Sequence, residues 1–216
     1  AWSSRKPRLP LPPTQTWLAQ NGPTGARMSA AGRYPAPGWV PQGGWWVDKS
    51  LVFAHALQES NFQASAVSPA KAQGLMQITP ITVRDHAPRL GLSASQVDIF
   101  DPGVNLAFGQ QNLEMLRDSP ATGGALPKII AAYNAGLTPI TRWNYEIHDQ
   151  GDPLLYMESI PYWETRSYVS IVMKNYWMYE RQARAVSQSR VALATNAWPG
   201  FPGVDQGNGR VYLSAQ

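Results

Sequence analysis

Residues 51–62 read LVFAHALQESNF. With the residues before it, this stretch places apolar side chains at 47, 51 and 54 and at 46, 53 and 57, which is helical spacing. Glu59 ends this helix, so its carboxylate lies at the negative end of the helix dipole. The stretch therefore predicts a buried helix that ends in an acidic residue.

The other helices are indicated by their ends, where a capping residue precedes a proline or a glycine follows the last turn. These signals are Thr79-Pro80, Asp101-Pro102, Pro127, Gly136 and Thr138-Pro139. A last long helix is predicted over residues 165–187, which contain no Pro or Gly. No stretch alternates long enough to predict a half-buried strand. The sequence therefore predicts a mainly α domain over residues 45–188.

The two ends of the chain differ from this domain in composition. Residues 1–44 contain eight Pro and six Gly, and residues 1–50 hold six Lys/Arg against one Asp, which predicts a basic arm or linker. Residues 189–216 include the run WPGFPG and predict an irregular tail. Because no basic stripe continues into residues 45–188, we expect no nucleic-acid partner.

Composition also excludes several kinds of chemistry. The chain has 216 residues and no cysteine, so it offers one sizeable core but no thiol nucleophile and no thiolate metal site. Its three histidines, at 55, 86 and 148, show no metal-ligand spacing, and we expect neither a metal nor a cofactor. His55 fits a packed or partly exposed side chain better than a catalytic base. No apolar run is long enough for a transmembrane segment, and Ala1 follows no apolar signal segment, so any export signal is expected to be removed or never present.

Carboxylates remain as the candidates for catalysis. Glu114 and Glu180 lie in predicted long helices among polar neighbours, and we expect both in solvent. Glu59 is different, because the helix C-terminus and apolar neighbours such as Phe53 and Phe62 all disfavour its anion. These effects raise a pKa and suit a general acid. A surface glutamate at a frayed helix end is the alternative from this local pattern alone.

Four short motifs follow one another between residues 59 and 169. They are ESNF at 59–62, GLMQ at 74–77, AAYNAG at 131–136 and ESIPYWETRSYV at 158–169. In this order and at these separations they resemble the catalytic domain of the soluble lytic transglycosylases, which share a lysozyme-like fold with goose-type lysozymes. The resemblance covers about residues 45–185 and implies a lysozyme-like helical domain with irregular N- and C-terminal extensions. The large helical ring domain of that family has no counterpart in this chain.

The resemblance implies a role for each matching position. Glu59 matches the single catalytic acid/base. The implied substrate-binding residues are Ser68, Gln77, Tyr133, Asn134 and Glu164, while Ser60 and Met76 match motif positions with more structural roles.

Some of these roles have alternatives. Tyr133 matches the tyrosine that hydrogen-bonds the catalytic carboxyl, but it also fits a core tyrosine whose hydroxyl binds a carbonyl. Ser68 matches a serine near the acid and the N-acetyl group of the sugar, and Gln77 matches a residue that lines the glycan groove. Glu164 fits either a groove residue or a helix N-terminal residue favoured by the dipole. Thr79 departs from the family, where many relatives carry a methionine.

The implied activity is cleavage of the β-1,4 bond between N-acetylmuramic acid and N-acetylglucosamine, with 1,6-anhydromuramoyl products. The implied partners are peptidoglycan glycan strands, outside the cytoplasmic membrane, in the periplasm or at the cell wall; the resemblance does not identify a cell-wall or secretion-machine partner. Two alternatives stand beside it: a lysozyme- or chitinase-type hydrolase on the same fold, and an inactive glycan-binding scaffold.

Overall fold

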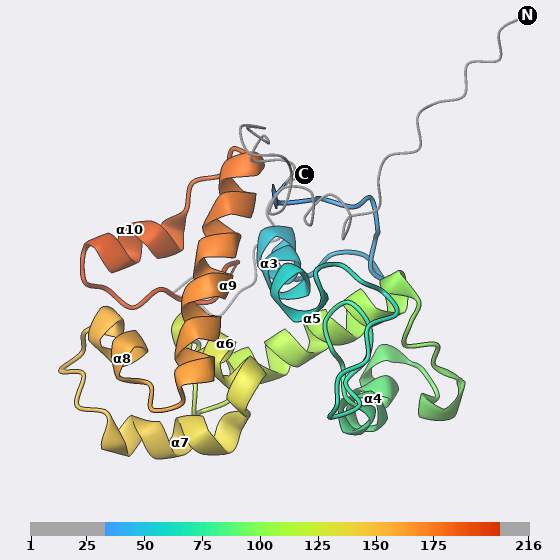
Figure 1. Cartoon of the computed structure of the whole chain (residues 1–216), viewed down its shortest axis with the longest axis horizontal. Helices are drawn as coiled ribbons and strands as arrows, with labels where there is room; N and C mark the ends of the chain where they lie inside the picture. Colours follow the sequence, from blue (N-terminus) through green and yellow to red (C-terminus); the bar gives the residue numbers. More distant parts are fainter. Residues whose placement is uncertain (1–32, 204–216) are drawn as a thin grey trace, which may run out of the picture.

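The computed structural model describes residues 33–203, in which helices are joined by short loops and the only β pairing is in isolated bridges (Figure 1). The helices are α3 (Lys49–Ser60), α4 (Pro80–His86), α5 (Pro102–Asp118), α6 (Leu126–Ala135), α7 (Leu137–Glu146), α8 (Pro153–Ser159), α9 (Trp163–Gln182) and α10 (Gln188–Ala194). Two short 3-10 helices, Ala87–Leu90 and Ala94–Gln96, follow α4. The predicted mainly α fold is confirmed.

The core forms around α3. Residues 51–56 of this helix are all buried, and α9 packs along it (Figure 1). Helix α6 packs in turn against α9, α5 and α7. Because α3 is covered on every side, the position of its last turn is fixed by packing as well as by hydrogen bonds.

Several predicted helix ends are confirmed by their caps. Thr79 accepts a hydrogen bond from the Thr82 amide at the start of α4. Asp101 accepts one from the Val104 amide at the start of α5. Gly136 follows the last residue of α6 with a positive φ of 81°, a conformation that costs glycine little.

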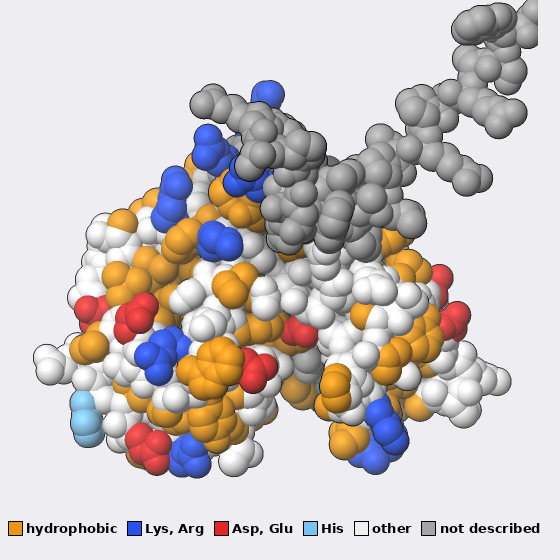
Figure 2. Space-filling model, viewed as in Figure 1, with side chains coloured by type: hydrophobic (Ala, Val, Ile, Leu, Met, Phe, Trp, Pro, Cys, Tyr) orange, Lys and Arg blue, Asp and Glu red, His pale blue; other side chains and the backbone are white. Residues whose placement is uncertain are grey.

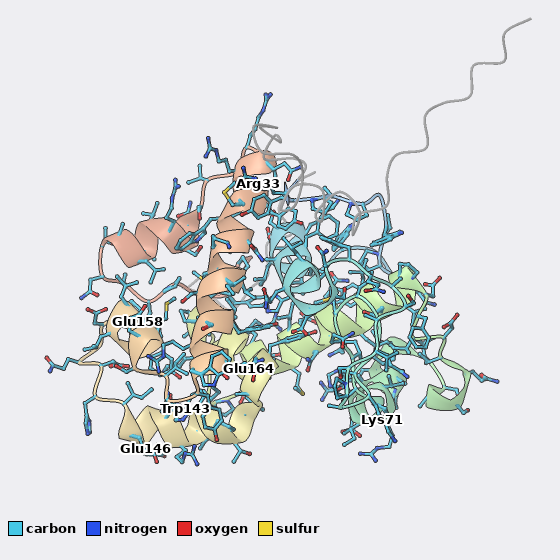
Figure 3. All side chains as sticks on the ribbon, in the orientation of Figure 1. Arg33, Lys71, Trp143, Glu146, Glu158 and Glu164 are labelled. Atoms are coloured by element: carbon cyan, nitrogen blue, oxygen red, sulfur yellow. The ribbon has the colours of Figure 1, made fainter. Side chains whose placement is uncertain are left out.

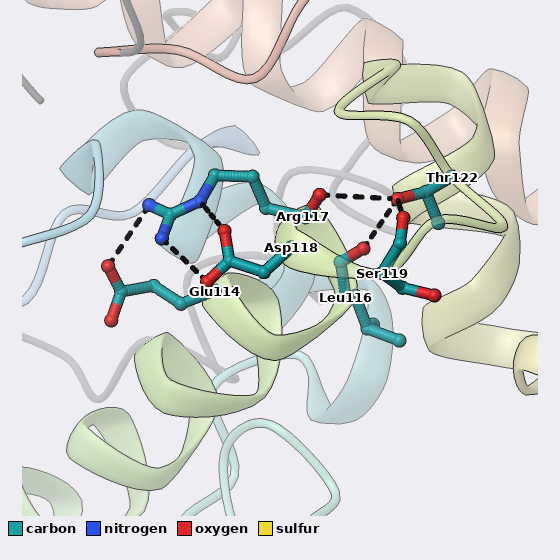
Figure 4. A network of polar contacts seen from close by, with 6 residues as sticks. All are labelled: Glu114, Leu116, Arg117, Asp118, Ser119 and Thr122. Carbon is teal, nitrogen blue, oxygen red and sulfur yellow. Dashed lines mark hydrogen bonds and ion pairs between the residues drawn. The ribbon is translucent and has the colours of Figure 1, made fainter. Parts of the chain in front are cut away.

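Helix α5 ends in a polar network (Figure 4). The Thr122 hydroxyl donates to the Leu116 carbonyl at 2.6 Å and lies 3.0 Å from the Ser119 carbonyl, so it satisfies carbonyls that the helix end leaves free. On the same last turn, Arg117 pairs with Glu114 at 3.1 Å and with Asp118 at 2.7 Å. Glu114 is therefore half-buried and paired, where the sequence predicted a solvated side chain.

Other boundaries differ from the prediction. Helix α7 begins at Leu137 because Gly136 already serves as its N-cap, and Thr138 makes no capping bond there. Helix α9 ends at Gln182, five residues before the predicted position 187, and Arg184 then adopts a left-handed conformation with φ 58°. Two helices were not predicted: α8, which Asp152 caps, and α10, which lies in the segment expected to be irregular.

Part of the predicted arm packs on the domain. The Tyr34 ring lies edge-on to Tyr179 with centroids 5.7 Å apart, and the Tyr179 hydroxyl donates to the Pro35 carbonyl at 2.9 Å. The Trp39 ring contacts Phe62. The sequence predicts that the domain starts at Trp45. These contacts place the start of the packed domain earlier in the chain. The rest of the arm, and the tail from residue 204 onward, lie outside the described residues.

The tail also packs as far as residue 203. The Leu126 amide donates to the Pro199 carbonyl at 2.8 Å, and Phe201 is buried beside the Arg117 guanidinium. Glu180 of α9 is buried too, with only 5% of its surface exposed, whereas the sequence predicted a solvated side chain. Burial raises the pKa of the Glu180 carboxyl, and the nearby Ser187 and Tyr176 hydroxyls lower it in part.

Candidate active site

Glu59 lies in the last turn of α3, one residue before the helix ends at Ser60. Asn61 follows in a left-handed conformation with φ 53°, and its amide donates to the Leu57 carbonyl, which turns the chain away from the helix axis. Ser60 ties this turn to the neighbouring loop, because its hydroxyl donates to the Leu75 carbonyl at 2.8 Å. The end of α3 thus presents Glu59 at a position held from both sides.

The surroundings of Glu59 favour its protonated form. Burial raises the pKa of the Glu59 carboxyl from its usual 4.5 to about 7, and a hydrogen bond from Tyr168 lowers it in part. No second carboxylate of the described residues contributes to this shift. At neutral pH Glu59 therefore exists in both protonation states, as an acid that later acts as a base requires.

The tyrosine bonded to Glu59 is Tyr168 of α9, not Tyr133. The Tyr168 hydroxyl donates to the Glu59 carboxylate. The Tyr133 hydroxyl instead donates to the Met76 carbonyl at 2.8 Å, which is the alternative that the sequence left open. Burial and the nearby Glu59 charge raise the pKa of both tyrosines well above 10, so both remain hydrogen-bond donors at neutral pH.

His55 lies one turn before Glu59 in α3 and is completely buried. Its Nδ1 lies 3.0 Å from the Leu51 carbonyl, and its ring lies between Tyr133 and Tyr168, with centroid separations of 4.8 and 6.2 Å. Burial lowers the pKa of the His55 imidazole to about 4. The side chain is therefore neutral near pH 7 and packs the two tyrosines beside Glu59.

The GLMQ loop is held by α5. The side chain of Asn105 accepts from the Met76 amide at 2.8 Å and donates to the carbonyls of Gln73 and Ile99 at 3.0 and 2.9 Å. Gly74 has a φ of 75°, and a Cβ there would lie 2.1 Å from the Asn105 amide nitrogen. Met76 packs against Gly109 of α5, where a Cβ would lie 2.0 Å from the Met76 sulfur. A side chain at Gly74 would displace the Asn105 amide, and one at Gly109 would displace the Met76 side chain.

Ser68 and Gln77 lie in the same loop, and their described hydrogen bonds are within it. The Ser68 hydroxyl accepts from the Ala72 amide at 3.1 Å and closes a tight turn. The Gln77 side chain donates to the Gly74 carbonyl at 2.9 Å. Both side chains are half-buried. No described hydrogen bond joins either side chain to Glu59, so their roles toward substrate stay predictions.

Asn134 and Glu164 are brought together in a pocket of about 450 Å³, which is lined by Asn134, Ala135, Pro161, Tyr162, Trp163, Glu164 and Thr165. The Thr165 hydroxyl donates to the Asn134 carbonyl oxygen at 2.6 Å and fixes that side chain. Glu164 lies in the first turn of α9, where the dipole favours a carboxylate. One turn later, Tyr168 reaches Glu59, so α9 connects the pocket with the acid.

The surface is notched between the part that carries α7 to α9 and the part that carries α4 (Figure 2). Apolar side chains gather on both sides of this notch (Figure 2). Glu164 lies on one side of it and Lys71 on the other (Figure 3). Glu164 therefore lies beside an open depression in the surface (Figure 2 and Figure 3).

Sequence reasoning missed Tyr168, Asn105 and the aromatic pair Tyr162 and Trp163. Tyr168 had a usable signal, because it follows Glu164 by four residues and so shares its face of α9. Asn105 had none, since a polar residue in an apolar helix does not reveal which loop its amide binds.

Within residues 33–203, no group of three or more His, Asp and Glu side chains is placed to hold a metal ion. None of the helices in this part combines the length and apolar character needed to cross a membrane.

Comparison with known proteins gives consistent matches. Residues 42–154 match the family model of the transglycosylase SLT domain. The soluble lytic murein transglycosylase of Escherichia coli K12 is 31% identical over 129 residues, which are 59% of this chain and 20% of the relative. The membrane-bound lytic murein transglycosylase C of Histophilus somni is 35% identical over 108 residues, or 46% of this chain and 30% of the relative.

A solved structure matches as well. The 70-kDa soluble lytic transglycosylase of Escherichia coli superposes with a TM-score of 0.64 at 26% identity, over 85% of this chain and 28% of that one. The chain thus spans between about a fifth and a third of the length of these relatives. The expected lysozyme-like helical fold is confirmed by this superposition.

Proposed function

The chain belongs to the transglycosylase SLT domain family, and from this premise we propose that it cleaves the β-1,4 bond between N-acetylmuramic acid and N-acetylglucosamine in peptidoglycan. The observation that carries the proposal is Glu59, a buried and partly protonated carboxyl at the end of α3 that is bonded to Tyr168. An acid with a pKa near the working pH is suited to donate a proton and then to accept one.

The proposed reaction has two steps. Glu59 donates its proton to the glycosidic oxygen, the C1–O bond breaks, and the acetamido oxygen of the muramoyl sugar bonds to C1. The Glu59 carboxylate then removes the proton of the C6 hydroxyl, whose oxygen attacks C1 and displaces the acetamido oxygen. The 1,6-anhydro ring closes and Glu59 is again protonated, so no water is consumed.

The described hydrogen bond of the Glu59 carboxylate is to Tyr168 and not to an acidic side chain, and we favour the route that needs one carboxylate over the route that needs two. Glycosidases of the ordinary kind place a second carboxylate within about 5–10 Å of the acid. The pKa of Glu59 reflects only burial and Tyr168 among the described groups. A nucleophile supplied by the substrate removes the need for the second carboxylate.

The matched relatives are named for murein, as soluble or membrane-bound enzymes. We place the chain in the same setting, outside the cytoplasmic membrane and in contact with peptidoglycan glycan strands. Gln77, Ser68, Asn134 and Glu164 are proposed to bind those strands along the notch.

Mass spectrometry of the fragments released from purified sacculi tests this proposal. The protein should release 1,6-anhydromuramoyl fragments, and Glu59→Gln should lower release by about 10³-fold or more, because both proton transfers are lost. The variant should still bind glycan. Fragments with reducing ends only would establish a hydrolase instead, and binding without any release by the unaltered protein would establish a scaffold.

A further inference from the structure

Trp163 begins α9 with 75% of its surface exposed. All other tryptophans within residues 33–203 are buried or half-buried, and Trp143 is completely buried. An exposed indole ring presents a large apolar face that a ligand can cover. Because Trp163 belongs to a helix, its backbone is held in place before any ligand arrives.

Tyr162, the residue before it, is also held in place. Its ring lies edge-on to Trp143 with centroids 5.0 Å apart, and Arg142 donates to its hydroxyl at 3.3 Å. Arg142 in turn lies 3.5 Å from Glu146, so its charge is partly balanced on α7. The two aromatic residues therefore form a firm apolar border along one side of the pocket.

The rest of the pocket is polar and suited to hydroxyl and amide groups. The carbonyl oxygen of Asn134 is occupied by Thr165, and no described hydrogen bond uses the amide hydrogens of Asn134, which leaves them to donate to a ligand. The Glu164 carboxylate lines the same pocket and accepts hydrogen bonds. An apolar face beside one donor and one acceptor matches a pyranose ring, which has an apolar C–H face and hydroxyl groups around its edge.

We propose that Trp163, with Tyr162, forms a sugar-binding subsite that holds one ring of the glycan strand by stacking. This inference rests on the proposed function and adds a specificity-determining residue to it. Trp163 lines the pocket together with Glu164, which lies one helical turn before Tyr168 on α9, so the subsite is about one turn from the residue that bonds Glu59.

Charge favours the glycan over the stem peptide as occupant. The peptide carries carboxylates, which the Glu164 carboxylate in the same pocket would repel. An N-acetylglucosamine ring carries no charge and can accept from Asn134 and donate to Glu164. The occupant of the subsite is therefore a sugar ring of the strand itself.

Steady-state cleavage of peptide-free glycan strands by the whole chain tests the subsite. Trp163→Ala should raise KM about tenfold, equivalent to about 1.4 kcal/mol of lost stacking, and leave kcat within about twofold. Trp163→Tyr keeps a ring at this position and should recover most of the loss. Tyr145→Ala is the matched control, since Tyr145 is 81% exposed on α7 and does not line the pocket.

The outcomes separate this proposal from the proposed function. An unchanged KM for Trp163→Ala would overturn the subsite while the proposed activity stands. A rise in KM seen only on strands that carry stem peptides would overturn the sugar as occupant and assign the subsite to the peptide. If the unaltered protein cleaves nothing, calorimetric binding of the same strands decides: a tenfold weaker affinity for Trp163→Ala supports the subsite without catalysis, and equal affinities reject it.

Discussion

Two opposing effects determine the pKa of Glu59. Burial at the end of α3 disfavours the anion, while the Tyr168 hydroxyl favours it. The balance lies near neutral pH. Either effect can be altered by a single substitution, and the direction of the change follows from which form of the carboxyl it stabilises.

Tyr168→Phe removes the bond that favours the Glu59 anion. The pKa of Glu59 should rise above about 7, so the alkaline limb of the kcat/KM profile should move to higher pH. The rate near pH 7 should fall by about ten- to a hundredfold, because a hydrogen bond to a charged group contributes about 1.5–3 kcal/mol. Tyr133→Phe should differ, losing stability through the Met76 carbonyl with little movement of the limb. A limb that moves in Tyr133→Phe alone would restore the assignment made from the sequence.

Glu59→Gln tests the same balance through the pH dependence of the free energy of unfolding. The folded pKa of about 7 lies above the usual 4.5, so the protonated form stabilises the fold at low pH and this contribution is lost as pH rises through 7. The variant should match the unaltered protein below about pH 4.5 and exceed it by about 1–3 kcal/mol above pH 7. Denaturant unfolding between pH 4 and 8 measures the difference. His55 titrates in both proteins, with stability lost as pH falls from 6.5 through 4, and so cancels.

At the scale of elements, the active site depends on a loop that α5 holds from behind. Asn105 supplies three hydrogen bonds to backbone groups of this loop and its surroundings, and Gly74 provides the space that the Asn105 side chain occupies. In the same loop, the Met76 carbonyl accepts a hydrogen bond from Tyr133 and the Leu75 carbonyl accepts one from Ser60. Motif residues that lack a direct contact with Glu59 thus still determine where it lies.

Gly74→Ala should therefore cost more than a glycine substitution elsewhere. Its Cβ would lie 2.1 Å from the Asn105 side chain in a backbone with φ 75°, and we expect a loss of about 2–4 kcal/mol and weaker cleavage. Gly123→Ala is the matched control, because Gly123 also has a positive φ, 56°, but open space around it, and should lose only about 1–2 kcal/mol. Denaturant midpoints compare the two. Equal losses would show that backbone strain, and not the contact with Asn105, sets the cost.

Most of the predicted helix starts have local signals, although α8 was missed despite the same kind of signal at Asp152-Pro153. Thr79 and Asp101 cap their helices through their own side chains, so two residues are enough to predict the start. Helix α10 begins without a side-chain cap, and the left-handed turn at Arg184 that ends α9 carries neither Gly nor Pro. Likewise Glu59 was evident from its motif, whereas its bond to Tyr168 joins residues 109 positions apart and depends on how α9 packs on α3.

At the scale of the whole molecule, the excess of positive charge and the candidate catalytic residues lie in different parts of the chain. Residues 1–50 carry a charge balance of +5 and residues 51–216 one of −1, while the groups around Glu59 belong to residues 55–168. In the proposed function, we expect the basic arm to bind an anionic wall and the domain to cleave its glycan. The contacts of residues 34–39 with Tyr179 and Phe62 show where the domain begins structurally.

Two deletions separate these contributions. Removal of residues 1–32 leaves every contact within residues 33–203 in place, so turnover on short soluble glycans should change by less than about twofold, while binding to sacculi should weaken most at low salt. Removal of residues 1–44 also strips Tyr34 and Trp39 from the core and leaves the Tyr179 hydroxyl without the Pro35 carbonyl. This longer deletion should lower the free energy of unfolding by about 3 kcal/mol or more. Thermal melts measure the stability of both deletion variants, and turnover measures their activity. If removal of residues 1–32 reduces turnover as deeply as Glu59→Gln does, the arm takes part in the chemistry and does not serve only to hold the wall.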